Sequence, residues 1–132
     1  MQKLTLEYPL STKSTKLVWD MIGNAAGLQK WLADQVIEDE DSMTFTWGHP
    51  WTERDTKTSR ILEKENMNYI RMLWDYHEDT PDAYWEIRIE QSDLTGMINL
   101  LITDFAADAE EEEDLRGIWD DNFERLHRVS GF

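Results

Sequence analysis

The most abundant chemically active side chains in this sequence are carboxylates, which could hold a cation or transfer protons. Two clusters of them stand out, at residues 38–41 and at residues 110–114. A calcium loop needs ligands at spaced positions around a central glycine, and residues 38–41 have neither feature. We interpret residues 38–41 as a turn. Residues 110–114 are interpreted as the start of a helix, where acidic side chains stabilise the positive end of the helix dipole.

The other residue types that could carry chemistry form no recognisable motif. The three histidines, His49, His77 and His127, have no partner at zinc-ligand spacing, and the sequence has no cysteine. It also has no Gly-x-Ser-x-Gly nucleophile elbow and no glycine-rich phosphate loop. We therefore expect no metal and no cofactor, and an enzyme is the less favoured interpretation.

Asp104 is the candidate for acid–base chemistry, because it lies near the end of the apolar segment 97–105. A carboxyl group that points into an apolar cavity has a raised pKa and can exchange protons. The alternative is that Asp104 bonds to backbone where a strand joins the next helix. This second interpretation is favoured.

Asn122 is the candidate for ligand binding, because it interrupts an apolar helical stripe that includes Trp119 and Leu126. A buried amide that lacks a hydrogen-bond partner costs roughly 1–3 kcal/mol, so its partner is informative. Asn122 either orients a bound ligand or donates to a strand carbonyl or a buried water. The structural alternative is favoured here too.

A long C-terminal helix, residues 108–129, must position several of these side chains. Asp108 as N-cap and Glu111 three residues later form a capping box. At 100° per residue one stripe of this helix is apolar apart from Asn122, and the opposite side is charged. Its members are Leu115, Ile118, Trp119, Asn122, Phe123, Leu126 and Val129.

The rest of the chain predicts a sheet that covers this stripe. Alternating apolar residues or apolar runs predict strands at residues 3–8, 35–38, 43–47, 52–62, 69–75, 83–90 and 97–105. Residues 52–62 are polar enough to suggest an edge strand. Two short helices, 13–22 and 25–33, follow the first strand, with Leu17, Val18, Met21 and Ile22 toward the core. The predicted fold class is α+β: a curved antiparallel sheet of about seven strands around a long C-terminal helix.

The composition limits which partners the protein can bind. Against 28 acidic residues there are 13 basic ones, which gives a net charge of −15. Such a charge repels nucleic-acid backbones and anionic membrane surfaces, so we expect neither as a partner. The length of 132 residues fits one domain, residues 1–132. The chain contains no apolar run of membrane-spanning length and no signal peptide, so a cytoplasmic location is expected.

The order of elements and several local blocks resemble the START-like, or helix-grip, superfamily, also called SRPBCC. The resemblance is strongest to its bacterial branch related to activators of a heat-shock-chaperone ATPase. The residues that carry it are Leu17-Val18-Trp19-Asp20, Gly27-Leu28, Trp31-Leu32, Phe45-Thr46-Trp47-Gly48, Leu73-Trp74 and Leu101-Ile102-Thr103-Asp104-Phe105. One departure is Gly117-Ile118-Trp119, where that family often has Gly-Trp at the start of the helix.

The resemblance implies a cavity between the sheet and the long helix that holds a hydrophobic or amphipathic small molecule. We expect it to be lined by Met21, Trp31, Phe45, Met72, Trp74, Trp119 and Asn122. Trp51 follows Pro50 in a predicted loop and either packs at the rim, acts as a lid or contacts a second subunit. The alternatives to a ligand-binding module are a co-chaperone-like module that engages a protein partner or a second copy, and a cyclase- or hydrolase-type enzyme.

Overall fold

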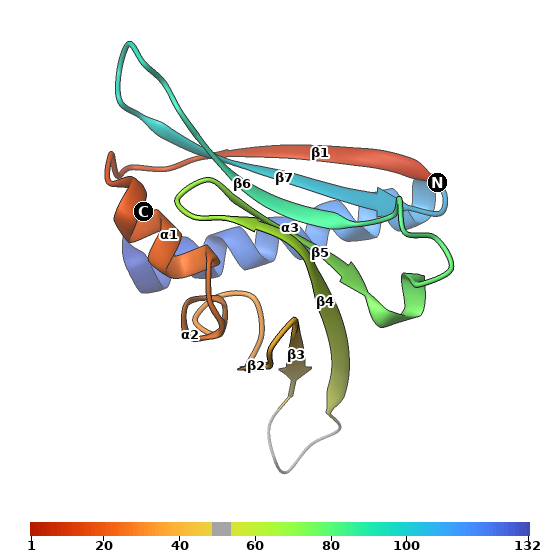
Figure 1. The fold of residues 1–132 in the computed structure, drawn as a ribbon. Helices are drawn as coiled ribbons and strands as arrows, with labels where there is room; N and C mark the ends of the chain where they lie inside the picture. Colours follow the sequence, from red (N-terminus) through yellow and green to blue (C-terminus); the bar gives the residue numbers. More distant parts are fainter. Residues whose placement is uncertain (49–53) are drawn as a thin grey trace.

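The computed structural model describes residues 1–48 and 54–132, and within them one curved sheet wraps around a long helix (Figure 1). The helices are α1 (Thr15–Ile22), α2 (Ala25–Leu28), the single 3-10 turn η1 (Asp75–His77) and α3 (Ala109–Ser130). The strands are β1 (Gln2–Pro9), β2 (Gln35–Glu38), β3 (Ser42–Trp47), β4 (Asp55–Glu65), β5 (Tyr69–Trp74), β6 (Trp85–Gln91) and β7 (Ile98–Ala106). The predicted fold class, with two short helices after the first strand, is confirmed.

All neighbouring strands in the described residues are antiparallel, in the order β1-β7-β6-β5-β4-β3-β2. The first strand therefore pairs with the last one, with Leu4 opposite Asp104. Alternation along the strands places one set of apolar residues on the side that faces α3. Met43 and Phe45 of β3 and Trp85 and Ile87 of β6 are almost fully buried there.

The prediction that residues 52–62 form an edge strand is wrong. Of that range the structure describes β4 from Asp55 onward, and it lies between β3 and β5. Asp55, Lys57 and Ser59 are paired with Trp47, Phe45 and Met43 of β3. Directly paired residues of an antiparallel sheet share one face, so these polar side chains belong to the face toward α3. Asp55, Lys57 and Ser59 lie on the face of β4 toward α3, and the strand has a neighbour on each side. Its polar sequence therefore does not indicate an edge position.

Helix α3 begins and ends at residues that stabilise its termini. The Asp108 carboxylate accepts a hydrogen bond from the Glu111 N–H at 2.9 Å, which confirms the predicted N-cap. Gly131 ends the helix in the left-handed region at a φ of 77°, a conformation that glycine adopts without strain. Its N–H donates to the His127 carbonyl, so the last turn is closed.

The buried stripe of α3 is narrower than predicted. Trp119 and Leu126 are buried, and Phe123 stacks on Tyr8 of β1 with ring centroids 4.4 Å apart. Ile118 and Val129, predicted to face the core, are 54% and 53% exposed. The helix is closely attached to the β1–β7 side of the sheet, and its other side is free to border an open cavity.

The α1–α2 pair closes one end of the core, beside the C-terminus of α3 (Figure 1). Val18, Trp19, Met21 and Ile22 are buried, whereas Leu17, predicted to face inward, is 51% exposed. Gly27 allows the two helices to touch, because a Cβ there would collide with the Asp20 carbonyl. The predicted helix 25–33 ends at Leu28, and the following residues 29–32 form turns in which the Leu32 N–H donates to the Leu28 carbonyl, with Trp31 1% exposed.

Candidate functional site

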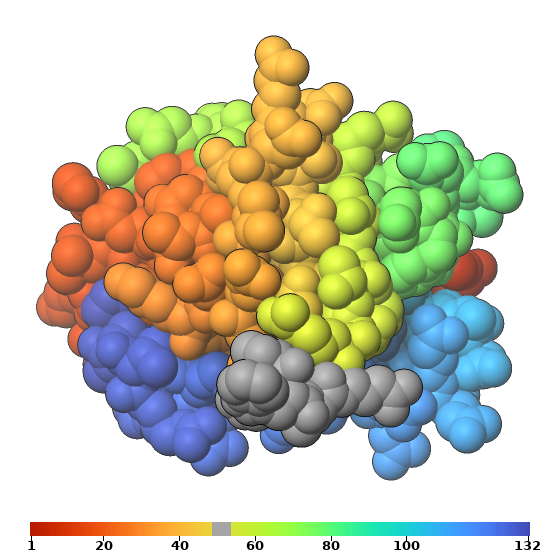
Figure 2. All heavy atoms as spheres, turned by 90° about the horizontal axis from the view of Figure 1, so that it is seen from below, coloured from red at the N-terminus to blue at the C-terminus, as the bar shows by residue number. Residues whose placement is uncertain are grey.

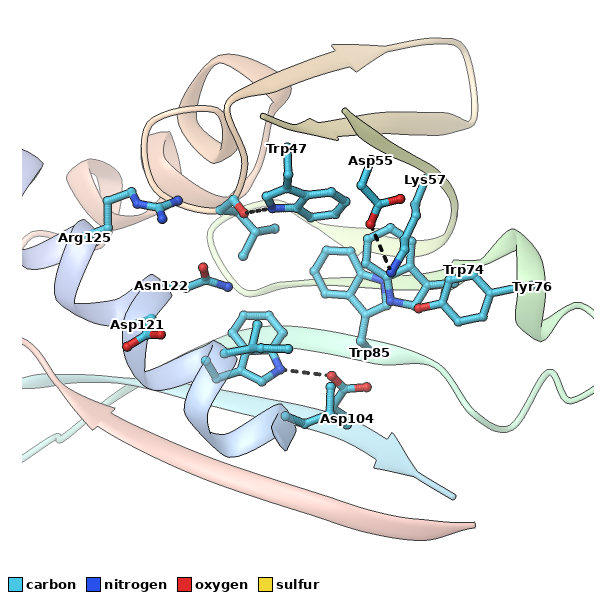
Figure 3. A pocket seen from close by; sticks show the side chains of 14 residues that line it. Trp47, Asp55, Lys57, Trp74, Tyr76, Trp85, Asp104, Asp121, Asn122 and Arg125 are labelled. Carbon is cyan, nitrogen blue, oxygen red and sulfur yellow. Dashed lines mark hydrogen bonds and ion pairs between the residues drawn. The ribbon is translucent and has the colours of Figure 1, made fainter. Parts of the chain in front are cut away.

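A cavity of about 380 Å³ lies between α3 and the strands β3 to β7 (Figure 3). Its position follows from the attachment of α3 to the β1–β7 side, which leaves the helix and the far strands apart. Figure 2 shows a face of the molecule on which the α1–α2 segment lies beside α3. The volume falls within the range of about 300–1,000 Å³ that is typical of small-molecule sites.

Aromatic side chains from the sheet form most of the apolar wall. Trp85 lies at the back of the cavity and stacks on Trp74, with ring centroids 5.2 Å apart. Trp74 in turn stacks on Tyr76 of η1 at 6.0 Å. Trp47 of β3 and Trp119 of α3 also line the cavity. Leu32, Leu115 and Ile118 complete the apolar lining. The arrangement offers flat faces to a flat or chain-like apolar ligand.

Local packing holds these indoles in fixed orientations. Trp47 Nε1 donates to the Leu32 carbonyl at 2.9 Å, and Trp85 Nε1 donates to Ser59 Oγ at 3.0 Å. Ser59 is fully buried on the inner face of β4, so this polar strand supplies a partner for a buried indole. Most of the aromatic wall is therefore present before any ligand arrives.

Lys57 and Arg125 are the basic residues among the described residues that line the cavity, and both already have partners. Lys57 Nζ lies 3.7 Å from Asp55 Oδ2 and 5.4 Å from the centre of the Tyr76 ring. Arg125 Nη1 donates to the Trp31 carbonyl at 3.2 Å, which joins α3 to the segment after α2. In Figure 3 the two cations lie toward opposite sides of the cavity.

Asp104 is the buried ionisable group of this lining, at 8% exposure. Its Oδ2 accepts from Trp119 Nε1 at 2.9 Å and its Oδ1 accepts from the Phe105 N–H at 2.8 Å. Burial raises the pKa of this carboxyl, although both hydrogen bonds and the nearby His77 oppose the rise. The favoured interpretation, a carboxylate bonded to backbone near the strand-to-helix junction, is confirmed. The same carboxylate also lies in the cavity wall.

Burial also raises the pKa of Tyr76 to about 12, with Asp104 and other nearby carboxylates adding to the effect. The Tyr76 hydroxyl therefore stays protonated at neutral pH and can act as a hydrogen-bond donor. Its side chain is partly exposed, at the end of the cavity where Lys57 lies (Figure 3).

Asn122 extends from α3 into the cavity as predicted, and it is half-buried. Figure 3 shows its amide with no hydrogen bond to the other residues drawn. Its neighbours on α3 in the lining are Ile118, Asp121 and Arg125. A ligand in the cavity would meet this amide on the helix side.

Three of the seven residues expected to line a cavity do so, namely Trp74, Trp119 and Asn122. The other four, Met21, Trp31, Phe45 and Met72, are packed in the core at 7% exposure or less. They point inward as expected but lie where other side chains cover them. Whether any of the seven contacts a ligand stays a prediction. Sequence reasoning missed Trp47 and Trp85 as wall residues, and it also missed the polar face of β4.

The other candidate residues named from the sequence are the three histidines and Trp51. His49 and Trp51 lie outside the described residues. His127 is exposed on α3, and His77 lies in η1 with its Nδ1 buried and without a hydrogen-bond partner in the described part of the chain. Among the residues that the structure describes, no group of His, Asp and Glu has the arrangement of a metal site. No helix in the described ranges is long and apolar enough to cross a membrane.

The sequence matches the START-like superfamily domain over residues 1–132, so the chain belongs to this superfamily. A solved structure from Bacteroides fragilis is 35% identical, with a TM-score of 0.65, and the match covers 99% of this chain and 92% of that one. No curated protein sequence matches the chain.

Two solved structures of lower identity share the fold. The Aha1 dimer from Colwellia psychrerythraea is 9% identical with a TM-score of 0.70, over 96% of this chain and 93% of that one. The AHSA1 protein from Silicibacter pomeroyi is 15% identical with a TM-score of 0.72, over 97% and 96%. The suspected resemblance to this bacterial branch is confirmed at the level of fold.

Proposed function

We propose that residues 1–132 form one domain that binds an apolar or amphipathic small molecule between α3 and the sheet. The observation that supports it most is the open cavity of about 380 Å³ with preformed aromatic walls. A fold that served only to pack α3 would fill this space with side chains, because protein interiors are normally close-packed. Here Ile118 is left 54% exposed at the cavity instead.

The polar groups of the cavity suit an amphipathic ligand better than a pure hydrocarbon. Asn122 faces the space from α3, and Lys57 and Tyr76 lie on the opposite side near the sheet (Figure 3). A few placed polar groups in an apolar pocket fix the orientation of a ligand. We propose Asn122 as one such group.

The test is a thermal-shift panel of medium-chain fatty acids, the matching alcohols and flat aromatic compounds. A ligand that binds only the folded state, at 100 times its Kd, adds about 2.7 kcal/mol to the free energy of unfolding. The Asn122→Leu variant fills space and removes the amide, so shifts with polar-headed compounds should shrink while the fold is retained. Asn99→Leu makes the same change on β7, outside the cavity lining, and should leave the shifts unchanged.

Failure of every compound to shift the melting temperature would overturn the proposal. The fold would then favour a co-chaperone-like module, the second function that suits it. An enzyme is not proposed, because the partners that the described structure gives Asp104 are an indole and a backbone N–H, which hold the carboxylate in place.

A further inference from the structure

The cavity wall contains a buried carboxylate, and its described hydrogen-bond donors are both neutral. Asp104 accepts from the Trp119 indole and the Phe105 backbone, and it forms no ion pair with any described residue. A buried carboxylate without a cation lacks much of the stabilisation that water would give it. Each carboxylate oxygen can accept a further hydrogen bond in addition to the one it has.

Among the described residues, one other acid is buried as deeply, and it has different partners. Glu86 of β6 is 5% exposed, and Arg71 and Arg88 both donate to its carboxylate, at 2.9 Å and 3.1 Å. Those two hydrogen bonds outweigh the effect of burial and lower the pKa of Glu86. The fold therefore supplies cations to a buried carboxylate on one face of β6. On the cavity side it leaves Asp104 with neutral donors.

The two cationic side chains that line the cavity do not pair with Asp104 either. Lys57 lies near Asp55 and over the Tyr76 ring, and Arg125 donates to a carbonyl on the far side of the cavity from Asp104 (Figure 3). The protein carries a net charge of −15, so its long-range field attracts positive ligands and repels negative ones.

We propose that the ligand carries a protonated amine or a comparable cationic N–H group, which bonds to Asp104 while its flat apolar body lies against the tryptophan wall. This inference rests on the proposed function and makes it narrower. Asp104 is then the group that selects the ligand. Asn122 and the indoles contact the remainder of the ligand.

The test uses three probes with the same aromatic body, naphthylethylamine, naphthylethanol and naphthylacetic acid, titrated by calorimetry at one pH. Hydrogen bonds to charged groups contribute more than neutral ones, so the amine should bind on the order of tenfold more tightly than the alcohol. The acid should bind most weakly. In Asp104→Asn the preference for the amine over the alcohol should disappear while the alcohol still binds.

Two controls separate a local pair from the general negative field. Glu124→Gln removes one negative charge from an exposed position of α3 outside the cavity lining, and the preference should persist. The preference should also persist at about 1 M salt, where the Debye length is roughly 3 Å and long-range attraction is screened.

The results have distinct meanings. Equal or weaker binding of the amine in the wild type would overturn the inference but keep the proposed function. So would a preference that survives Asp104→Asn or is lost at high salt. Binding of none of the probes, together with no shift in the thermal panel, would overturn both. If Asp104→Asn does not fold, the wild-type ranking and its salt dependence still decide.

Discussion

The indole of Trp119 and the carboxylate of Asp104 join α3 to β7 through a buried hydrogen bond of 2.9 Å. Both side chains also line the cavity. One of the contacts that hold the helix on the sheet is therefore part of the cavity wall. Substitutions here should change stability and binding together, whereas the remaining wall residues can be tested separately.

Replacing Trp119 by Ala should lower the free energy of unfolding by about 3–5 kcal/mol, the usual cost of emptying a large aromatic site. The change also removes an indole donor from Asp104. Asp121→Ala, at an exposed position of α3 that borders the cavity, should change the free energy of unfolding by no more than about 0.5 kcal/mol. Chemical denaturation measures both. Small and equal effects would show that the helix is not held as described.

The buried Asp104 should make stability depend on pH in a specific direction. Its folded-state pKa is raised above the ordinary value of 3.8, so the folded state binds this proton more tightly than the unfolded state. The contribution of Asp104 is thus fully present below 3.8 and is lost as pH rises through the raised pKa. Urea unfolding at a series of pH values should show Asp104→Asn gaining on the wild type as pH rises.

Glu124→Gln controls for the loss of one negative charge in that series. Curves for wild type and Asp104→Asn that stay parallel over the whole pH range would contradict the assigned environment of Asp104.

Two glycines in helices should respond to alanine in opposite directions. At Gly27 a new Cβ would collide with the Asp20 carbonyl and lie 2.8 Å from the backbone of Met21, so the α1–α2 contact must open. We expect a loss of about 1–3 kcal/mol, as for other overpacked sites. At Gly117 nothing lies within 4 Å of the added atom, and alanine should gain roughly 0.5–1 kcal/mol from helix propensity.

Thermal melting of the two variants compared with the wild type distinguishes these expectations. A Gly27→Ala protein as stable as the wild type would mean that α2 is not packed on α1 at this position.

The net charge of −15 should make the protein more stable in salt. Self-repulsion among surface acids opposes the compact state and is screened as the Debye length falls from roughly 30 Å at 10 mM to 8 Å at 150 mM. The melting temperature should therefore rise over this range of monovalent salt. A flat or falling curve would show that the acids are mostly paired locally.

The elements and their faces could be predicted because they depend on local patterns. Met43, Phe45 and Trp47 alternate along β3, and Asp108 with Glu111 marks the start of α3; both patterns are present in the structure. Alternation predicts on which face of a strand a residue lies. It does not predict whether that residue borders the cavity or is covered by other side chains in the core. Phe45 was therefore expected in the cavity wall, although it lies beneath Trp47 and Trp74 in the core.

The residues that line the cavity were harder to predict, because the polar residues of β4 among them form the same pattern as an exposed edge strand. The polar sequence of β4 predicts a solvent-exposed strand. Lys57 and Ser59 nevertheless face α3, because they are paired with inward-facing residues of β3. Only the register of neighbouring strands reveals this. Likewise, Ile118 falls in the apolar stripe of α3 but borders the open space, since the helix packs mainly against β1 and β7.

The pairing of β1 with β7 has a consequence for how the chain is made on the ribosome. Synthesis delivers Gln2–Pro9 before its partner Ile98–Ala106, with the strands β2 to β6 in between. Until then the first strand has no neighbour, and its backbone donors and acceptors must remain hydrated or be protected by other proteins. Contacts between residues far apart in sequence also slow folding. The first strand can thus join the sheet only after β7 has been synthesised, so a nascent chain stalled before β7 would carry an unpaired first strand.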